Sequence, residues 1–167
     1  MLYVCFETNL RHNGKVVKVA QLAGNVSMKS NYHHGEDNLH KTIVGMANSY
    51  IGSNNIPLLF RDGQFGSRSA NGKDAAAGRY IWTKLDQLTR LIFRPDDDCL
   101  LDYIEDDGDK VEPRYYVPIL PMILVNGCLG IGTGWASTVP SYNPADLVEC
   151  IKIWLENDGN VMKDDVS

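Results

Sequence analysis

Tyr80, preceded by Arg79, is the strongest candidate for covalent chemistry in this sequence. Phenols ionise only near pH 10, so a tyrosine that attacks phosphorus at neutral pH needs assistance. An adjacent guanidinium, fixed in charge and shaped to pair with phosphate oxygens, supplies that assistance. A histidine such as His34 can polarise a phosphate or relay a proton. These residue types fit attack on a phosphate ester, but spacing alone does not bring them together, and most tyrosines at strand spacing belong to cores or surfaces.

Two other motifs resemble known sites without completing them. His34-Gly35-Glu36 matches half of a zinc deaminase signature, but the required Pro-Cys-x-x-Cys partner is absent from the sequence. The glycine-rich residues 127–134 lack the lysine of a phosphate loop and the helix start of a dinucleotide fingerprint, since Trp135 and Pro140 follow. We therefore interpret residues 127–134 as a glycine-rich turn that permits close approach of the backbone.

Length and charge bound the alternatives. With 167 residues and 44% apolar residues, the chain fits one ordinary domain, or a small domain with a piece of a second. The net charge of −5 is unevenly distributed: up to Arg94 there are twelve Lys and Arg against six Asp and Glu, and after it four against fifteen. A nucleic-acid partner is therefore possible for the basic first half only.

The cysteines and the long uncharged stretch exclude other classes. Four scattered cysteines without a Cys-x-x-Cys pair predict reduced core residues in an intracellular protein, and the N-terminus has no basic signal region. Residues 115–145 carry no charge but are interrupted by prolines and glycines, which argues against a transmembrane helix. The acid cluster 96–98 resembles a metal site in composition only and fits a solvated turn better.

Hydrophobic periodicity predicts the elements that must position Tyr80 and His34. Residues 2–6 are β-prone, and apolar residues at helical spacing predict a helix over residues 16–26. A second helix is predicted from Glu36 through Ile51, with acidic residues in its first turn. The two helices form a helix-turn-helix candidate with the second as the reading helix, although paired amphipathic helices also occur in cores of every kind.

Strands and shorter helices are predicted around and after this pair. Residues 56–60 and 64–66 fit a β-ribbon with a glycine turn, and residues 81–83 favour a strand. A short helix is expected over residues 86–92, and a hairpin over 101–104 and 111–119 with an acidic turn at Asp107-Gly108. A last amphipathic helix covers residues 146–155.

An ordered series of short motifs over residues 4–155 resembles the breakage-reunion region of eukaryotic-type DNA topoisomerase II. The two adjacent histidines after Tyr32, with no proline between them, resemble the eukaryotic form more than gyrase. Gly78 departs from the pattern, which carries proline before the arginine. The motifs are Lys18-Val-Ala-Gln-Leu-Ala-Gly24, Tyr32-His-His-Gly-Glu36, Gly52-Ser-Asn-Asn55, Gly63-Gln-Phe-Gly66, Gly72-Lys-Asp74, Arg79-Tyr80-Ile81, Val111-Glu-Pro113, Pro121-Met-Ile-Leu-Val-Asn-Gly127 and Gly130-Ile-Gly-Thr-Gly-Trp135.

The resemblance implies an α+β fold: a winged-helix domain (a helix-turn-helix with a β wing) over residues 1–118, its N-terminal part missing, followed over residues 119–167 by the start of a truncated α/β tower domain. It further implies that Tyr80 attacks a DNA phosphodiester and leaves a 5′-phosphotyrosine and a free 3′-hydroxyl. Arg79 is expected to stabilise charge on the phosphate, and His34 to contact the phosphate or assist proton transfer.

The same resemblance implies a set of DNA contacts. Ile131 corresponds to the isoleucine that wedges between base pairs and bends the DNA. Residues expected to contact DNA are His33, Gln64, Arg68 and Lys73, although Arg68 and Lys73 also fit solvated surface charges.

The activity implied is that of an ATP-dependent isomerase that changes the topology of double-stranded DNA. The full-length form is expected to be a homodimer, and no membrane partner is expected. ATP and Mg²⁺ are expected to bind regions absent from this chain, which by itself would hold neither cofactor and would be inactive. The expected location is the nucleus, with a kinetoplast-like mitochondrion or a viral factory as alternatives. A non-catalytic winged-helix DNA-binding module is the alternative function.

Overall fold

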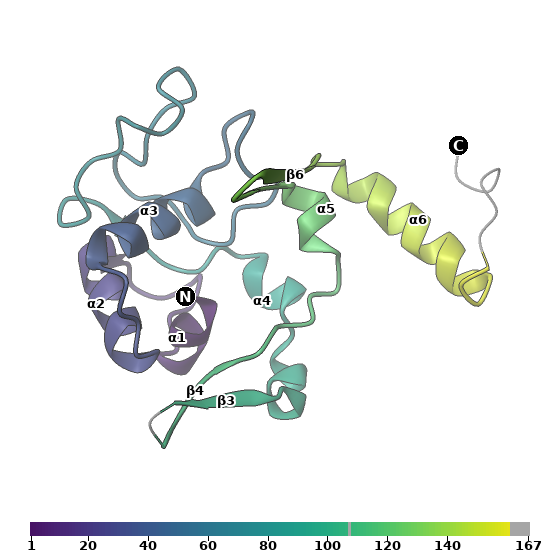
Figure 1. The fold of residues 1–167 in the computed structure, drawn as a ribbon, viewed down its shortest axis with the longest axis horizontal. Coiled ribbons are helices and arrows are strands. Elements are labelled where there is room, and N and C mark those ends of the chain that lie inside the picture. The colour runs from purple at the N-terminus through teal and green to yellow at the C-terminus, as the bar shows by residue number, and fades with distance from the viewer. Residues whose placement is uncertain (107, 161–167) are drawn as a thin grey trace. The chain divides into compact units, whose positions relative to one another are not determined.

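The computed structural model describes residues 1–106 and 108–160, which contain both helices and strands (Figure 1). The chain divides into a first unit, Met1–Ile119, and a second unit that begins at Leu120. Each unit has its own elements and is described by itself below. A mixed helix and strand composition agrees with the predicted α+β class at this level of detail.

Three helices form most of the core of the first unit: α1 (Leu2–Glu7), α2 (Val19–Lys29) and α3 (Glu36–Ala47). The two predicted helices are confirmed, and their inward residues are almost inaccessible to water. The first begins at Val19 and not at residue 16, because residues 17 and 18 pair in a strand with residues 82 and 83. Burial of each Val, Leu or Ile side chain among the inward residues contributes about 1.5–3 kcal/mol. The buried set includes Val19, Leu22, Ala23 and Val26 of α2, and Leu39, Ile43 and Ala47 of α3.

Helix α1 contradicts the strand predicted for residues 2–6. Val4 and Cys5 are both fully buried, and a helix places two such neighbours against the core where a strand would turn one of them outward. The main chain closes the helix through a 2.9 Å hydrogen bond from the Thr8 N–H to the Val4 carbonyl. The β propensity of these residues reflects packing and not an intrinsic backbone preference, so the core overrides it.

Helix α3 ends four residues earlier than the prediction. Asn48 leaves the helical conformation with φ −68° and ψ 140°. The side chain of Asn54 then donates hydrogen bonds to the carbonyls of Gly45 at 2.6 Å and Asn48 at 2.8 Å. These bonds satisfy carbonyls that the helix end leaves without partners. Ile51, which the apolar pattern included, is 77% exposed.

The predicted ribbon over residues 56–66 does not form. The strand β2 (Trp82–Thr83) pairs antiparallel with β1 (Val17–Lys18), as the preference of residues 81–83 indicated. Leu59 and Asp62 make isolated bridges to Leu85 and Trp82, so residues 56–62 align with a distant segment and not with 64–66. Helix α4 (Thr89–Ile92) is shorter than predicted, because the Asp86 side chain accepts the Leu88 N–H in a turn that precedes it.

The acidic hairpin is confirmed, with a shorter second strand. β3 (Tyr103–Asp106) pairs antiparallel with β4 (Asp109–Pro113), with a register irregularity between Tyr103 and Glu105. Gly108 turns with φ +85°, and Asp107 lies outside the described residues.

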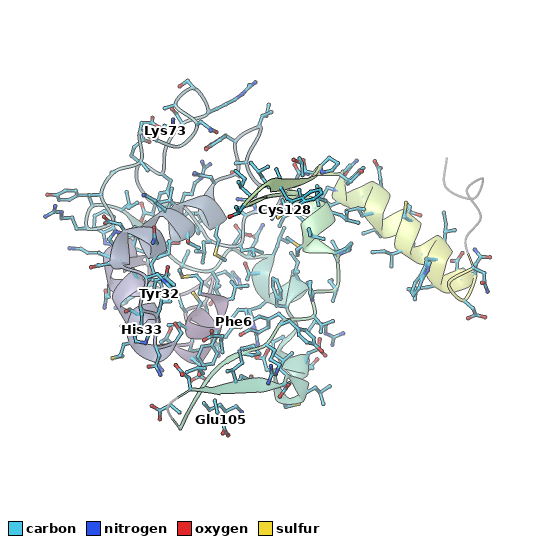
Figure 2. All side chains as sticks on the ribbon, viewed as in Figure 1. Phe6, Tyr32, His33, Lys73, Glu105 and Cys128 are labelled. Carbon is cyan, nitrogen blue, oxygen red and sulfur yellow. The ribbon has the colours of Figure 1, made fainter. Side chains whose placement is uncertain are left out.

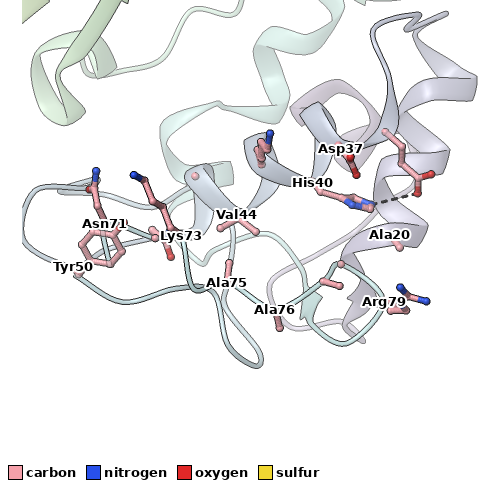
Figure 3. A pocket seen from close by; sticks show the side chains of 17 residues that line it. Ala20, Asp37, His40, Val44, Tyr50, Asn71, Lys73, Ala75, Ala76 and Arg79 are labelled. Carbon is pink, nitrogen blue, oxygen red and sulfur yellow. Dashed lines mark ion pairs between the residues drawn. The ribbon is translucent and has the colours of Figure 1, made fainter. Parts of the chain in front are cut away.

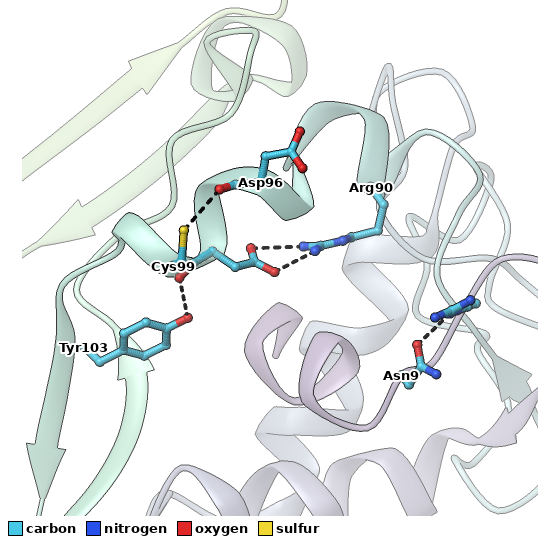
Figure 4. A network of polar contacts seen from close by, with 7 residues as sticks. Asn9, Arg90, Asp96, Cys99 and Tyr103 are labelled. Carbon is cyan, nitrogen blue, oxygen red and sulfur yellow. Dashed lines mark hydrogen bonds and ion pairs between the residues drawn. The ribbon is translucent and has the colours of Figure 1, made fainter.

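The acid cluster 96–98 lies in a short 3-10 helix, η1 (Pro95–Leu100), and is only partly the solvated turn that was predicted. Asp98 is held by two hydrogen bonds from Arg90, of 2.6 and 3.3 Å, in a half-buried ion pair (Figure 4). The Tyr103 hydroxyl donates to the Asp98 carbonyl at 3.0 Å. Asp98 therefore joins η1 to α4 and β3.

The second unit consists of α5 (Met122–Asn126), β5 (Cys128–Gly132), β6 (Trp135–Val139) and α6 (Pro144–Glu156). β5 and β6 pair antiparallel in regular register. The predicted last helix is confirmed, and Asn143 begins it by accepting the Ala145 N–H at 3.0 Å. None of the helices within residues 1–106 and 108–160 has the length and hydropathy needed to cross a membrane.

The prediction that all four cysteines are core residues is right for Cys5 and wrong for the other three. All four are free thiols, but Cys99 and Cys128 are exposed and Cys150 is half-buried. Cys128 begins β5, whose residues are exposed throughout, so it has no core to enter. Only Cys5 is buried, and burial raises the pKa of its thiol to about 12.

Candidate functional site

Arg79 and Tyr80 lie together on the surface of the first unit. The Tyr80 side chain is 64% exposed, although its neighbour Ile81 is 1% exposed and anchored in the core. The Arg79 guanidinium carbon lies 5.4 Å from the centre of the Tyr80 ring. Among the described residues, no hydrogen bond occupies the Tyr80 hydroxyl. The phenol and the guanidinium are thus both accessible to a partner from solution.

The N-terminus of α2 holds the main chain on both sides of this pair. The Ala20 N–H donates to the Gly78 carbonyl, and the Val19 N–H donates to the Ile81 carbonyl, both at 3.0 Å. The first N–H groups of a helix have no intrahelical partner, and Lys18 provides no side-chain cap. The carbonyls of the tyrosine segment therefore complete the helix, and the helix fixes the segment.

His33 and His34 lie at the start of α3, where both are exposed. Gly35 precedes the helix with φ +88°, a conformation that side chains disfavour. The His34 carbonyl accepts a 2.8 Å hydrogen bond from the Asn38 side chain, and its ring contacts Tyr32 edge-on at 5.4 Å between centroids. Within the described residues, neither a hydrogen bond nor a ring contact joins His34 to Arg79 or Tyr80.

Residues 64–74 form a tightly closed loop that carries Arg68 and Lys73. The Asp74 carboxylate accepts the Ser67 N–H at 2.7 Å, the Ser67 hydroxyl at 2.8 Å and the Gln64 amide at 3.2 Å. The hydrogen bonds from Ser67 lower the pKa of Asp74. Gln64, predicted as a DNA contact, thus has an intramolecular partner.

Both cations of this loop are exposed, and Figure 2 shows Lys73 well away from Tyr32 and His33. The loop is closed by glycines, since a Cβ on Gly66 would lie 2.6 Å from the Gly72 Cα. Arg68 and Lys73 are therefore held on a compact projection at a distance from the histidine pair.

A cleft of about 810 Å³ separates α3 from the segment that leads to Arg79 (Figure 3). Its walls carry charges of both signs together with small residues. His40 projects into it from α3, on the side that faces Ala20 and the chain around Arg79. The charged lining residues are Glu36, Asp37, Lys41, Lys73 and Arg79.

Ile131 lies in β5 of the second unit and is 81% exposed. It pairs with Ala136 across the hairpin, and Gly130 and Gly132 flank it. The segment that resembled a phosphate loop is thus the hairpin of β5 and β6. An apolar side chain on a narrow ribbon has the shape of a wedge.

The described residues contain no group of three or more His, Cys, Asp or Glu side chains able to hold a metal ion. The acids of η1 do not fit that role, because Arg90 and Arg94 pair with Asp98 and Asp96. No chemical step is therefore assigned to a metal held by this part of the chain.

Sequence reasoning missed the N-terminus of α2, which holds the tyrosine segment, and His40, which lines the same cleft as Gly78. The absence of a capping residue at position 18 was the available signal for the first. No local pattern pointed to His40, because its neighbour Gly78 is distant in sequence.

Comparison with known proteins shows the family to which the chain belongs. Residues 1–165 match the family of the A subunit of DNA gyrase and topoisomerase IV, and the chain belongs to this family. It is 52% identical over 162 residues to a probable DNA topoisomerase 2 of Dictyostelium discoideum, covering 97% of this chain and 10% of the relative. It is 54% identical over 152 residues to the DNA topoisomerase 2 of Saccharomyces cerevisiae, covering 91% and 10%.

A solved structure is similar as well. The DNA-binding, cleavage and re-ligation domain of Plasmodium falciparum topoisomerase II matches with a TM-score of 0.90 and 51% identity, over 96% of this chain and 22% of that one. The resemblance predicted from the motifs is therefore confirmed. The chain spans about a tenth of the length of the curated relatives it matches.

Proposed function

We propose that this chain is the tyrosine-bearing part of the DNA cleavage and re-ligation region of an ATP-dependent type IIA DNA topoisomerase. The observation that carries the proposal is the exposed Tyr80 beside Arg79, on a main chain held from both sides by α2. A nucleophile needs both access and a fixed position, and this segment provides both. Family membership and the similarity to a cleavage domain support the same activity.

In the proposed reaction, the Tyr80 Oη attacks a phosphorus atom of the DNA backbone. The new O–P bond replaces the bond to the 3′-oxygen, the phenolic proton passes to a base or water, and the 3′-oxygen leaves as a hydroxyl after gaining a proton. The phosphorus remains a diester in the 5′-phosphotyrosine link. The bond energy is therefore retained, and the 3′-hydroxyl can reverse the step without another energy source.

Arg79 and His34 have different roles in this proposal. Arg79 stabilises negative charge on the non-bridging oxygens as the phosphorus becomes five-coordinate. Its permanent charge and forked donors suit that task better than an ammonium group. His34 contacts the phosphate or assists proton transfer once DNA brings it near, because exposed side chains at the start of α3 can adjust to a bound ligand.

The first unit is proposed to act as a winged-helix domain, with α2 and α3 as the helix pair and α3 as the reading helix. His33, Gln64, Arg68 and Lys73 are proposed to contact DNA, and the basic balance of the first 94 residues supports a polyanionic partner. The second unit is proposed to begin the tower domain and to place Ile131 between base pairs.

The remaining properties concern the whole protein. We infer a homodimer that acts on double-stranded DNA in the nucleus, with ATP and Mg²⁺ bound by regions outside this chain. The names of its relatives support the action on DNA, and the other properties are those that the resemblance to the family implies.

The test is covalent trapping with the full native polypeptide that carries this chain. Linearised, end-labelled plasmid DNA is incubated with the protein, and the reaction is stopped with detergent. The peptide linked to DNA is then mapped by mass spectrometry. We expect a 5′ link to Tyr80 that disappears in Tyr80→Phe while the Kd for duplex DNA changes less than about threefold. Tyr115→Phe is the matched control, because Tyr115 is 68% exposed and also loses a surface hydroxyl.

Two outcomes would contradict the proposal. A covalent link that persists in Tyr80→Phe would assign the nucleophile elsewhere. DNA binding by the wild type without any covalent link would favour the alternative, a non-catalytic DNA-binding module.

A further inference from the structure

Gly78 lies so close to His40 that a side chain at this position would displace the ring by a few tenths of an ångström. A Cβ built on Gly78 would lie 3.1 Å from the His40 Nε2 and 3.2 Å from its Cδ2 and Cε1. These three ring atoms are the nearest neighbours of that position. The imidazole of α3 is therefore packed directly against the main chain of the tyrosine segment.

The backbone conformation of Gly78 does not itself require glycine. Its φ lies outside the left-handed range, in contrast to Gly63, Gly66 and Gly72 of the same region. Any L-residue can adopt such a backbone. The close fit at this position therefore comes from the His40 ring and not from the main-chain conformation of Gly78.

The His40 ring is mostly buried and lies beside Glu36 of the same helix. Its side chain is 24% exposed, and its Nε2 lies 3.3 Å from Glu36 Oε1 one turn earlier on α3 (Figure 3). The geometry of this ion pair is not that of a hydrogen bond, and the buried Nε2 has no hydrogen-bond partner among the described residues. The contact between His40 and Gly78 is thus a van der Waals contact of the imidazole ring and not a hydrogen bond.

Gly78 is also the residue through which the helix α2 holds the segment. Its carbonyl accepts the 3.0 Å hydrogen bond from Ala20, and Arg79 and Tyr80 follow directly. Gly78 is therefore confined between the N–H of α2 on one side and the imidazole of α3 on another. Arg79 and Tyr80 follow Gly78 directly, so a displacement of Gly78 moves the start of the segment that carries them.

We propose that His40 is a positioning residue for DNA cleavage: its ring is the wall that sets the place of Gly78, and thereby of Arg79 and Tyr80, relative to α3. This inference rests on the proposed function, because it concerns the geometry of the same attack. Misplacement of a nucleophile by about 1 Å costs roughly a hundredfold in rate, so a contact of this kind affects catalysis more than binding.

The test is a double-mutant cycle in the full native polypeptide, read as the single-turnover rate of covalent link formation at saturating DNA. Gly78→Ala should reduce the rate by about 10- to 100-fold, since the new methyl group meets the ring. His40→Ala opens space and should reduce it about three- to tenfold. The double variant should recover to the level of His40→Ala, because the methyl group no longer meets a ring.

Two further variants separate shape from other effects. Gly24→Ala in α2 is the matched control, since a Cβ there has nothing within 4 Å, and its rate should equal that of the wild type. His40→Leu keeps bulk against Gly78 without the imidazole nitrogens, so its rate should stay within about twofold of the wild type if the wall acts by shape. The thermal midpoint and the Kd for DNA are measured for every variant and should change little in His40→Ala and His40→Leu.

The outcomes are distinguishable. Recovery in the double variant with unchanged DNA affinity supports the positioning role. Losses that multiply in the double variant, or a His40→Leu rate as low as that of His40→Ala, overturn it while the proposed function stands. A wild type that forms no covalent link overturns the proposed function and the positioning role together. If Gly78→Ala fails to fold, the comparison of His40→Ala with His40→Leu decides alone.

Discussion

The N–H of Ala20 donates a 3.0 Å hydrogen bond to the carbonyl of Gly78, the residue immediately before Arg79. This bond joins the first turn of α2 to the segment that carries Tyr80. A helix N-terminus and a surface loop, each with unsatisfied backbone groups, here satisfy one another. The geometry of the candidate nucleophile thus depends on a helix far from it in sequence.

Removal of this hydrogen bond should impair cleavage. Ala20→Pro deletes the N–H in the first turn, where the proline ring itself is tolerated. We expect a loss of about 1–2 kcal/mol in the free energy of unfolding and a fall of about tenfold or more in the rate of covalent link formation. Gln21→Pro, in the same turn but outside the clamp, is the control, and equal losses in both would contradict this account.

Substitutions at Arg79 should separate charge from shape. Arg79→Lys keeps the charge but loses the fork of donors, and we expect a rate about tenfold lower. Arg79→Gln removes the charge and should lower the rate about 10²- to 10³-fold. Arg68→Gln is the comparison, because Arg68 is a proposed phosphate contact. This variant should bind DNA more weakly and with a smaller dependence on salt, but its rate at saturating DNA should be unchanged. A normal rate in Arg79→Gln would remove Arg79 from the mechanism.

The wedge assignment is tested by DNA bending. Ile131→Ala should reduce the bend measured by energy transfer between dyes at the two DNA ends, and should reduce cleavage, with little change in the fold. Leu129→Ala is the matched control, because Leu129 lies two residues earlier on the same face of β5 and is 67% exposed. An equal effect of both variants would indicate a general apolar contact, and an unchanged bend in Ile131→Ala would exclude the wedge.

The loop that carries Arg68 and Lys73 should loosen in acid. The hydrogen bonds from Ser67 lower the pKa of Asp74 below its ordinary value of 3.8. A depressed carboxyl pKa means that this group stabilises the folded loop above pH 4, and that the contribution is lost as the pH falls through the lower, folded-state value. The Ser67 amide, followed by NMR, should therefore titrate with a midpoint below 3.8, and Asp74→Asn should abolish that titration. A midpoint at or above the ordinary value would contradict the geometry of the loop.

The four thiols should differ sharply in reactivity. At pH 8 a maleimide should modify Cys99 and Cys128 within minutes, because both are exposed. Cys5 should react only after unfolding, since it is buried and burial raises its pKa to about 12. Peptide mapping at several times gives the order of modification. Early modification of Cys5 would show that α1 opens in the native state.

Local sequence patterns were sufficient to predict many of the helices and turns of this chain. The apolar spacing of α2, α3 and α6 and the turn at Gly108 were visible in the sequence, because the periods of helices and hairpins are properties of neighbouring residues. The ordered motifs identified the family, and Arg79 and Tyr80 are adjacent by covalent structure. The wrong predictions, a strand at residues 2–6 and a ribbon at residues 56–66, arose where the core decided between alternatives that the local residues left open.

Tertiary structure alone decided how the tyrosine segment is held. The hydrogen bond from the Ala20 N–H to the Gly78 carbonyl joins two segments that are far apart in sequence, and the packing of His40 against Gly78 adds a third. No spacing within the sequence predicts these contacts. Such contacts depend on where helices stop and how closely they pack, which is set by the volume of the shared core. The sequence by itself determined which residues could react, and the packing of α2 and α3 determined where they are placed.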